Sequence, residues 1–420
     1  MKLKILMLPN TTYPNSHPFL EDVFANILHN KGHEITWVMQ SSEKLKKNKI
    51  AQWKGSQVYV TMASPGTSRF GRLINHVLRC IGEILIIQKI VKSENFDLVQ
   101  VCERMIEGLL AVYLKKRYGI PFSFRYSFPF PEADIYASKR GIARYPLIYY
   151  LRGKISKPIF MWIMRKADLL LPVSNQMKQD LIGEGIPSEN MMVFPMGANT
   201  SIFQNISGAH IIKKFKLNTF PTIIYVGTMA KSRELDFLLR VIVKVKEKIQ
   251  NIKLLMVGDG DGRPQLEELS KSLDIEDNVV FAGQIPHSQV PEFIAAANIG
   301  VSPIPPVPIF KVGSATKTIE YMAMGKPVIG NDIADQKEVI NSSGGGICVR
   351  YDEEEFAEAI IELLNNPKKA KEMGKAGREW VIRNRSYEIL ANNLEQRYFD
   401  LVSSKHLKNY RPKNKKRKVF

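Results

Sequence analysis

The residues with the clearest chemical potential lie between 313 and 325, where a small polar loop leads into an apolar, helix-favouring run. Gly313, Ser314 and Thr316 are common at helix caps and turns, and a glycine and a proline after the run form a helix stop signal. Such a loop places backbone N–H groups at the start of a helix, where they favour anions. The stretch therefore predicts an anion site at a helix start.

Two charged side chains follow this loop. Lys317 places a cation at the start of the predicted helix, and Glu320 places a carboxylate on the same face, about 4.5 Å further along the axis. A cation at such a loop and a carboxylate one turn deeper suit a phosphate joined to a polyhydroxyl ring, as in a nucleotide sugar. The same residues are equally consistent with a capped helix that carries an ion pair. From this stretch alone, both interpretations stay open.

The composition limits the class of protein. A chain of 420 residues is too long for one ordinary hydrophobic core and suits two domains of roughly 200 residues. Hydrophobic residues make up 45% and charged residues 24%, which is typical of globular proteins. The three cysteines, Cys80, Cys102 and Cys348, are far apart and have no ligand-like spacing. This pattern favours a reducing compartment and argues against a disulfide framework or a zinc site.

The amino terminus is basic and then apolar as far as Leu8, like the beginning of a signal peptide. The apolar run is too short for one, and no small-residue cleavage site follows. It therefore predicts a buried first strand. No uninterrupted apolar run reaches the roughly 18 residues that a spanning helix needs. We expect a cytoplasmic protein.

The net charge of +19 is distributed unevenly. Residues 1–200 and the tail 405–420 are basic, whereas residues 201–404 are close to neutral. One domain and the tail are therefore expected to face something anionic, for which nucleic acid and an acidic membrane surface are both suitable.

Short apolar runs alternate with helical patterns, which predicts two α/β domains with parallel sheets. In the first half, strands are predicted at 4–8, 34–39, 58–62, 97–101, 121–124 and 168–174, with helices at 19–30, 72–92, 105–118 and 175–183. In the second half, strands are predicted at 222–226, 253–257, 278–281, 299–302, 327–330 and 346–349. A long helical stretch over 353–401 is interrupted at Asn366-Pro367.

A strand followed by Pro, Gly and Asn within 191–203 marks the domain boundary. We expect domains at 1–198 and 199–385, a helix at 386–404 that crosses back to the first domain, and an unstructured basic tail at 405–420. Two such domains would leave a cleft at the carboxyl ends of both sheets, where ligands are expected. On the amino-terminal side, the candidate residues near predicted loops at the cleft are His17, Arg104, Arg125 and Glu132.

Two more loops follow strands in the second half. Gly227 comes directly after a predicted strand and allows close backbone approach, and the same loop presents Arg233. The arginine fork suits a diphosphate because it can hold two oxygens. The next strand ends in Val257-Gly-Asp-Gly260, which taken alone is a common turn.

The ordered series of these motifs resembles the carboxyl-terminal domain of the retaining glycosyltransferases of family 4 (glycosyltransferase group 1). The resemblance rests on the runs at 226–227, 257–260, 281–286, 297–303 and 319–329, on Pro195-Met-Gly-Ala-Asn199 at the hinge, and more loosely on Lys31-Gly-His-Glu34. It implies a GT-B fold, in which two Rossmann-like parallel-sheet domains face an interdomain cleft. The amino-terminal domain would bind the acceptor and the carboxyl-terminal domain the nucleotide sugar.

Carried over by position, the resemblance assigns the diphosphate to Arg233, Lys317 and the small residues of the loops. Glu320 would bind the ribose hydroxyls, and Gln284 and Ile285 would lie beside the base. The small donor-binding residues are Gly227, Thr228, Gly258, Gly260, Gly313, Ser314 and Thr316.

The chain departs from the family pattern at four places, one of which is the first loop around Ser16-His17, where Gly-Gly is usual. Thr228 stands where the family often has an arginine, and Val312 stands where the first of two glutamates is usual. The region 124–132 also has no histidine where the family often has one. We expect neither a metal nor another cofactor, because the cations and loop amides can stabilise the leaving diphosphate.

The stretch 136–166 combines aromatic and apolar residues with eight Lys and Arg side chains. It predicts either a segment that lies on an anionic membrane or core helices with solvated charges. The basic first domain and tail favour the membrane, on which the enzyme would be peripheral.

We therefore expect a retaining, metal-independent glycosyltransferase that moves a sugar from a nucleotide-diphosphate sugar, UDP-sugar first and GDP-mannose second, to a lipid-linked saccharide in polysaccharide or glycoconjugate synthesis. The alternatives are a non-catalytic subunit of a glycosyltransferase complex and a nucleotide-sugar 2-epimerase. A nucleic-acid binder would rest only on the charge of the chain and its tail, and no nucleic-acid partner is expected.

Overall fold

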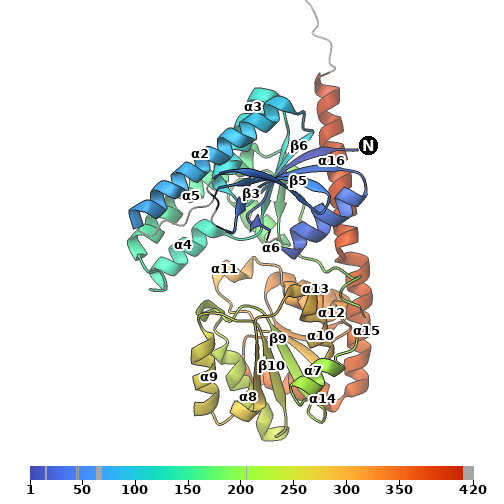
Figure 1. Ribbon diagram of the computed structural model, residues 1–420. Coiled ribbons are helices and arrows are strands. Elements are labelled where there is room, and N and C mark those ends of the chain that lie inside the picture. Colours follow the sequence, from blue (N-terminus) through green and yellow to red (C-terminus); the bar gives the residue numbers. More distant parts are fainter. Residues whose placement is uncertain (15–16, 44, 46, 63–68, 205, 410–420) are drawn as a thin grey trace, which may run out of the picture. The chain divides into compact units, whose positions relative to one another are not determined.

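The computed structural model describes residues 1–14, 17–43, 45, 47–62, 69–204 and 206–409 (Figure 1). The chain divides into two compact units. The first contains Met1–Pro172, Ile182–Met192 and the chain from Ala391 onward, and the second contains Val173–Leu181 and Val193–Leu390. In the part of the chain that the structure describes, no helix combines the length and the apolar character needed to cross a membrane.

The first unit is built on a sheet whose main path runs β4-β5-β3-β1-β6-β7-β8, with β2 paired to β3. All pairs are parallel except β4 with β5. The strands are β1 Lys4–Leu8, β2 Thr12–Tyr13, β3 Glu34–Ser41, β4 Lys49–Trp53, β5 Ser56–Thr61, β6 Leu98–Cys102, β7 Phe122–Tyr126 and β8 Leu169–Pro172.

The edge strand β4 was not predicted from the sequence. It joins β5 through a two-residue turn at Lys54 and Gly55, which have φ of 51° and 78°. Positive φ at both central residues is the geometry of a tight hairpin turn that matches the twist of the strands. Because β4 lies at the sheet edge and is largely exposed, its side chains lack the apolar pattern of a buried strand.

The helices predicted at 72–92 and 105–118 are present, the helix at 130–139 was not predicted, and two other predictions need correction. The predicted helix at 19–30 is divided into α1 and a π-helix, and the helix that ends the described chain continues to Asn409. Residues 405–409, expected to be unstructured, are therefore helical, and 410–420 lie outside the described residues. The helices are α1 Pro18–Leu20, η1 Glu21–Leu28, α2 Arg69–Ser93, α3 Met105–Tyr118, α4 Phe130–Lys139, α5 Pro146–Lys166, η2 Ser188–Asn190 and, from Ala391 onward, α16 Tyr387–Asn409.

The carboxyl-terminal part of α16 packs within the first unit through buried polar contacts. The Tyr398 hydroxyl donates to Oε1 of Gln100 at 2.5 Å, and both side chains are fully buried. Oε1 of Glu395 lies 2.9 Å from Nε2 of His33, and its other oxygen pairs with Lys31. Buried polar groups need such partners, so these contacts hold the helix in one register.

The second unit has a six-stranded parallel sheet in the order β11-β10-β9-β12-β13-β14. Apolar clusters cover both of its faces, one around α8 and α14 and the other around α10 and α12. The strands are β9 Thr222–Val226, β10 Lys253–Val257, β11 Val279–Gly283, β12 Ile299–Ser302, β13 Val328–Asn331 and β14 Gly346–Val349.

The predicted helix at 353–401 is interrupted twice, at Asn366 as expected and again at Arg385 and Ser386. The helices of this unit are α6 Asn175–Gly183, α7 Ala209–Lys214, η3 Lys231–Arg233, α8 Asp236–Lys248, α9 Arg263–Ser272, η4 Glu276–Asn278, η5 His287–Gln289, α10 Val290–Ala295, α11 Pro308–Lys311, α12 Thr316–Ala323, α13 Ala334–Ser343, α14 Glu353–Asn365 and α15 Pro367–Asn384.

Each sheet has one point at which the order of its strands reverses. In the first unit the chain builds outward from β1 through β3 and then returns to add β6 on the other side of β1. In the second unit the same reversal lies between β9 and β12. Ligands of open α/β sheets bind outside the carboxyl ends of the strands at these switch points. The candidate ligand sites are therefore the loops after β1 and β6 in the first unit and the loops after β9 and β12 in the second.

Candidate functional site

Glycines pack the loops after β9, β10 and β11 closely against one another. The Gly227 amide donates to the last carbonyl of β10, and the Gly258 amide donates to the Gly283 carbonyl, both at 2.9 Å. Gly258 has a φ of +136°, and a Cβ there would lie 2.0 Å from the Gly227 carbonyl oxygen. A Cβ on Gly260 would lie 2.5 Å from the Met229 carbonyl carbon. Because only glycine allows this approach, the loops form a dense backbone layer at the sheet edge.

Two cations come from the segments that follow β9 and β12. Arg233 ends η3, and its guanidinium lies 4.5 Å from the centroid of the Phe310 ring. Lys317 is in the first turn of α12, and its Nζ lies 5.3 Å from the Tyr225 ring centroid. Its Cε is 3.4 Å from where a Cβ on Gly227 would stand. The structure thus brings Gly227 and Lys317 together, as the sequence predicted.

The charges of this site are not balanced by the described residues. Burial and, after it, the nearby charge of Arg233 lower the pKa of Lys317 to about 8, although Glu320 acts in the opposite direction. Within the described part of the chain, neither Arg233 nor Lys317 forms a salt bridge. A buried lysine whose pKa is lowered further by a neighbouring cation marks a place where an anion would be stabilised.

Glu320 is buried and has a partner that was not identified from the sequence. Its Oε1 lies 2.8 Å from Nε2 of His287, whose ring packs against Phe203 with centroids 5.6 Å apart. Glu320 therefore does not pair with Lys317, and α12 has no side-chain cap at Ala315. The alternative of a capped helix with an ion pair is wrong at both points.

The loop before α12 uses more of its polar groups internally than the sequence suggested. The Gly313 amide donates to the Phe310 carbonyl at 3.1 Å, and the Thr316 amide donates to the Ser314 carbonyl at 3.1 Å. The Ser314 hydroxyl donates to Oδ2 of Asp335 at 2.7 Å. An anion at this loop would therefore depend more on the two cations than on a row of free amides.

Asp335 and Arg385 support this loop from behind. Both side chains are buried, and Nη2 of Arg385 lies 2.8 Å from Oδ1 of Asp335. The Met196 amide donates to Oγ of Ser314 at 3.2 Å, and Arg385 donates to the Met196 carbonyl at 3.4 Å. The network ties the hinge segment of the second unit to the loop, which positions the start of α12.

The remaining predicted donor residues lie at the same edge of the sheet. Thr228 and Gln284 are exposed, and Ile285 is half-buried against the apolar cluster under α12. Val312, which replaces the usual glutamate, is buried, and its carbonyl accepts from the Ser174 hydroxyl at 2.6 Å. Among the described residues, no group of three or more His, Cys, Asp or Glu side chains could hold a metal ion.

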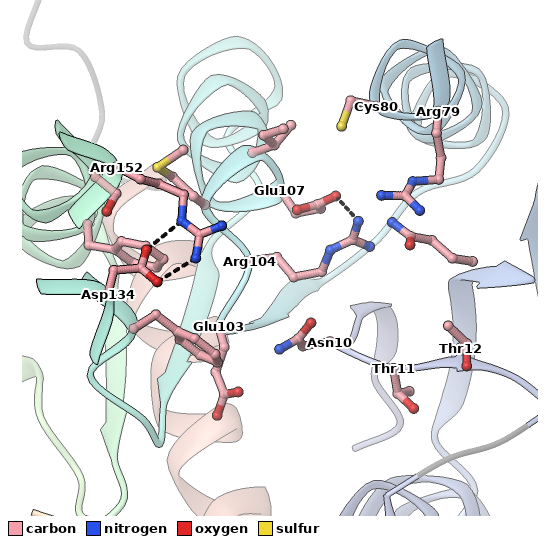
Figure 2. A pocket seen from close by; sticks show the side chains of 16 residues that line it. Asn10, Thr11, Thr12, Arg79, Cys80, Glu103, Arg104, Glu107, Asp134 and Arg152 are labelled. Atoms are coloured by element: carbon pink, nitrogen blue, oxygen red, sulfur yellow. Dashed lines mark hydrogen bonds and ion pairs between the residues drawn. The ribbon is translucent and has the colours of Figure 1, made fainter. Parts of the chain in front are cut away.

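The first unit has a pocket of about 550 Å³ at its switch point (Figure 2). Arg104 is held there between two buried carboxyl groups. Its Nη2 lies 2.8 Å from Oε2 of Glu83 and 2.7 Å from Oε1 of Glu107. The Thr61 hydroxyl also donates to Glu83, at 3.1 Å. Arg152 forms a two-point ion pair with Asp134 on the opposite wall.

The two acids that hold Arg104 differ in protonation. Burial opposes ionisation of Glu83, but the Arg104 charge together with hydrogen bonds from Glu107, Arg104 and Gln40 outweighs it and lowers the pKa of Glu83 below its ordinary value. Burial, reinforced by the carboxyl of Glu83 and opposed by Arg104, raises the pKa of Glu107 to about 7. Two close carboxyl groups that share one guanidinium tend to share one proton as well.

Glu103 lies between this pocket and the predicted candidate Arg125. It follows β6 directly, has a φ of 63°, and its Oε1 lies 3.4 Å from Nη1 of Arg125. Burial raises the pKa of Glu103, although Arg125 and the Asn10 side chain favour its ionised form. The Arg125 guanidinium also lies 4.1 Å from the centroid of the Phe19 ring.

The four acceptor-side candidates do not form one cluster. Only Arg104 lines the pocket, and Arg125 reaches it through Glu103. His17 is exposed and caps α1 by accepting from the Phe19 amide at 3.3 Å. Glu132 is paired with Lys157 at 3.0 Å. A glutamate directly after a predicted strand was the available signal for Glu103, whereas nothing local in the sequence marked Glu83 as a partner of Arg104.

Two family models match the chain. The model described as Glycosyltransferase Family 4 matches residues 23–202, and the model described as Glycosyl transferases group 1 matches residues 209–380. Together they cover both units, and the chain belongs to the glycosyltransferases of family 4, group 1. The family predicted from the sequence is confirmed.

Curated relatives in this family are distant. The GDP-mannose-dependent alpha-(1-6)-phosphatidylinositol monomannoside mannosyltransferase of Mycobacterium tuberculosis is 24% identical over 246 residues, which cover 56% of this chain and 64% of the relative. The alpha-monoglucosyldiacylglycerol synthase of Streptococcus pneumoniae is 23% identical over 337 residues, 75% of this chain and 69% of the relative. The match thus spans just under two thirds of the mannosyltransferase.

Solved structures show that the fold is GT-B. Sucrose-phosphate synthase from Thermosynechococcus elongatus aligns with a TM-score of 0.75 and 19% identity over 96% of this chain and 100% of its own. Anabaena HepE, crystallised with UDP-glucose, aligns with a TM-score of 0.68 and 13% identity over 96% of this chain and 100% of its own. At such identities the likeness establishes the architecture, as predicted, and leaves the chemistry to the residues.

Proposed function

We propose that this protein transfers a sugar from a nucleoside-diphosphate sugar to a saccharide acceptor, with retention of anomeric configuration and without a metal. The observation that carries the proposal is the pair of cations at the β9/β12 switch point. Burial and the charge of Arg233 lower the pKa of Lys317, and neither cation forms a salt bridge among the described residues, so a diphosphate would supply the missing negative charge.

In the proposed reaction, the bond between the anomeric carbon and the diphosphate oxygen breaks while a bond to the acceptor oxygen forms on the same face. The departing phosphate oxygen accepts the proton of the acceptor hydroxyl, so no side-chain nucleophile is required. Arg233 and Lys317 stabilise the charge that grows on the diphosphate. Glu320, oriented by His287, binds the ribose hydroxyls.

The family and the names of its members support this proposal. The mycobacterial relative is a GDP-mannose-dependent mannosyltransferase that acts on a phosphatidylinositol mannoside, and the streptococcal relative is a synthase of a glucosyldiacylglycerol. We propose UDP-sugar first and GDP-mannose second as donors, and a lipid-linked saccharide as acceptor.

The first test is thermal melting with UDP, GDP and their common sugar conjugates. We expect one nucleoside diphosphate to raise the melting temperature, and Lys317→Ala and Glu320→Ala to remove that rise. Lys311→Ala, a cation on the exposed surface of α11, is the matched control. A wild-type protein that responds to no nucleotide would contradict the donor site. Donor hydrolysis and sugar transfer are then assayed with and without EDTA. A protein that binds the nucleotide but shows neither activity would favour a non-catalytic subunit.

The proposed lipid-linked acceptor is supported by the surface of α5. Apolar side chains follow one another at helical spacing along its exposed face: Leu147, Ile148, Leu151, Ile155 and Trp162, which are 40–70% exposed. Exposed basic side chains accompany them: Arg144, Arg152, Lys154, Arg165 and Lys166. This combination suits an interfacial helix on an anionic bilayer, and we propose peripheral attachment to the cytoplasmic face of a membrane.

Vesicle sedimentation tests the membrane proposal. We expect binding to vesicles that contain phosphatidylglycerol, weaker binding to pure phosphatidylcholine, and loss of binding in a Leu147→Ser, Ile155→Ser double variant. Leu85→Ser on α2, where the side chain is 60% exposed, is the control. Unchanged binding of the double variant would show that α5 does not contact the bilayer.

A further inference from the structure

The pocket at the β1/β6 switch point is a built site whose ligand chemistry can be inferred from its charges. Asn10 follows β1, Glu103 and Arg104 follow β6, and Phe130 and Phe160 contribute apolar walls. Figure 2 shows polar side chains entering from both sides of the sheet edge. A pocket of this size and composition suits one ring of a small polar ligand.

Arginines dominate the view of the pocket, but nearby carboxyl groups nearly balance their charge. Arg104 is paired with Glu83 and Glu107, Arg152 with Asp134, and Arg125 with Glu103. With Arg79, which also lines the pocket, four guanidinium groups face four carboxyl groups in the pocket and directly behind its wall. Because Glu107 holds its proton part of the time, the pocket carries only a small excess of positive charge, and a phosphate or carboxylate ligand would have to displace an existing ion pair.

Holding the carboxyl groups in this pocket costs free energy of folding. Glu83 and Glu107 are only 1% and 3% exposed, and ion pairs buried to this degree contribute little to stability. Glu103 has a left-handed backbone conformation, which is strained for a residue other than glycine. Strain and buried charge concentrated in one pocket are typical of a functional site.

The pocket presents both hydrogen-bond donors and hydrogen-bond acceptors in fixed positions, and this combination matches the hydroxyl groups of a sugar. A hydroxyl donates one hydrogen bond and accepts others, so neighbouring hydroxyls can bridge a carboxylate and a guanidinium. The rings of Phe130 and Phe160 are each packed against a second aromatic ring, with centroids 5.1 Å and 5.8 Å apart, which fixes them as flat apolar surfaces. The C–H face of a sugar ring can pack on such a surface.

We infer that this pocket binds an uncharged sugar ring of the acceptor and discriminates against phosphorylated and acidic sugars. Hydroxyl groups of the ring donate to Glu103 and accept from Arg104 and the amide of Asn10. The inference rests on the proposed function, because it names the acceptor chemistry of the same transfer.

Saturation-transfer NMR on the full chain tests the inference with defined probes. Methyl α-glucopyranoside, methyl α-mannopyranoside and N-acetylglucosamine are compared with glucose 6-phosphate and glucuronate, each with and without UDP. We expect signals from at least one uncharged sugar and about tenfold weaker binding in Glu103→Gln, because a hydrogen bond to a charged group is lost. Asn10→Ala, a second lining variant with no buried charge, should weaken the same probe.

The outcomes separate this inference from the donor proposal. Equal or tighter binding of the acidic sugars, or uncharged-sugar binding that neither variant alters, would overturn it. Glu103→Gln leaves the second unit unchanged, so its melting shift with nucleoside diphosphate should equal that of the wild type. If nucleoside diphosphate does not shift the melting temperature of the wild type, the donor proposal is contradicted. The sugar-binding measurement on the first unit can still be interpreted in that case.

Discussion

The two switch points of this molecule occupy equivalent places in their sheets but are built from opposite materials. At β9/β12 the site is made of glycine backbone with two cations that lack carboxylate partners among the described residues. At β1/β6 it is made of guanidinium and carboxyl groups that form ion pairs with one another. An unbalanced site gains free energy from an anion, whereas a balanced one favours a neutral ligand. The same topology thus holds an unbalanced set of charges in one unit and a nearly balanced set in the other.

The largest predicted effect concerns the paired charges of the first unit. Glu83→Gln removes the carboxylate that remains ionised beside buried Arg104, and we expect it to reduce the free energy of unfolding by about 3 kcal/mol. Glu107→Gln should cost only about 1 kcal/mol at neutral pH, because Glu107 already holds its proton part of the time. Urea denaturation of both variants measures the difference. Equal losses would show that the two acids are equivalent.

The next effect concerns the backbone layer of the second unit. Gly258→Ala would place a Cβ 2.0 Å from the Gly227 carbonyl oxygen, and we expect a loss of roughly 2–3 kcal/mol from strain and overpacking. Gly344→Ala is the matched control, since Gly344 also has positive φ but nothing lies within 4 Å of its Cβ position. It should cost about 1 kcal/mol. Equal melting of the two variants would contradict close packing of the loops.

The unbalanced charge should also be visible in the pH dependence of stability. The pKa of Lys317 is lowered to about 8 in the folded protein, below its ordinary value of 10.5. Between these values the unfolded chain binds more protons, so the contribution of Lys317 to stability rises as pH increases through this window. Below pH 8 the folded protein carries the full destabilisation that comes from burying the charged Lys317. The free energy of unfolding is measured against pH for the wild type and for Lys317→Met, and the difference between the two curves should isolate this rise. A difference that does not change with pH would show that the pKa of Lys317 is not lowered.

The smallest predicted effect concerns the partner of Glu320. His287→Ala removes the imidazole that orients this carboxylate at 2.8 Å, and we expect nucleoside diphosphate affinity to fall about threefold to tenfold. His210→Ala, an exposed histidine on α7, provides the control. Calorimetric titration with UDP and GDP measures both. If the two variants bind alike, His287 does not position Glu320.

The sequence predicted the parallel strands and the loops of the donor site well, because these features are local. The strands at 222–226, 253–257, 299–302 and 346–349 have the predicted bounds, since each is a short, largely apolar run bordered by turn residues. Edge strand β4 and the π-helix were missed, because neither has a distinctive periodicity. In the site, Lys317 and Glu320 followed from a helix-start pattern.

The partners of the charged residues could not be predicted in the same way. His287 and Glu320 are 33 residues apart, and Arg104 and Glu83 are 21 residues apart. Their pairing depends on which strands become neighbours and on the rotation of α2 and α3, and local patterns contain neither. The sequence therefore located the charges, and only the structure distinguished the balanced site from the unbalanced one.

The most direct test of the account is proton uptake when nucleoside diphosphate binds. Titration calorimetry at pH 8, in two buffers of different ionisation enthalpy, reports the protons taken up with UDP or GDP. We predict uptake of about half a proton by the wild type, because the diphosphate restores the pKa of Lys317. In Lys317→Arg, whose guanidinium does not titrate, we predict binding without uptake. Binding with no proton uptake by the wild type, or with equal uptake by both proteins, would contradict an unbalanced cation site at β9/β12.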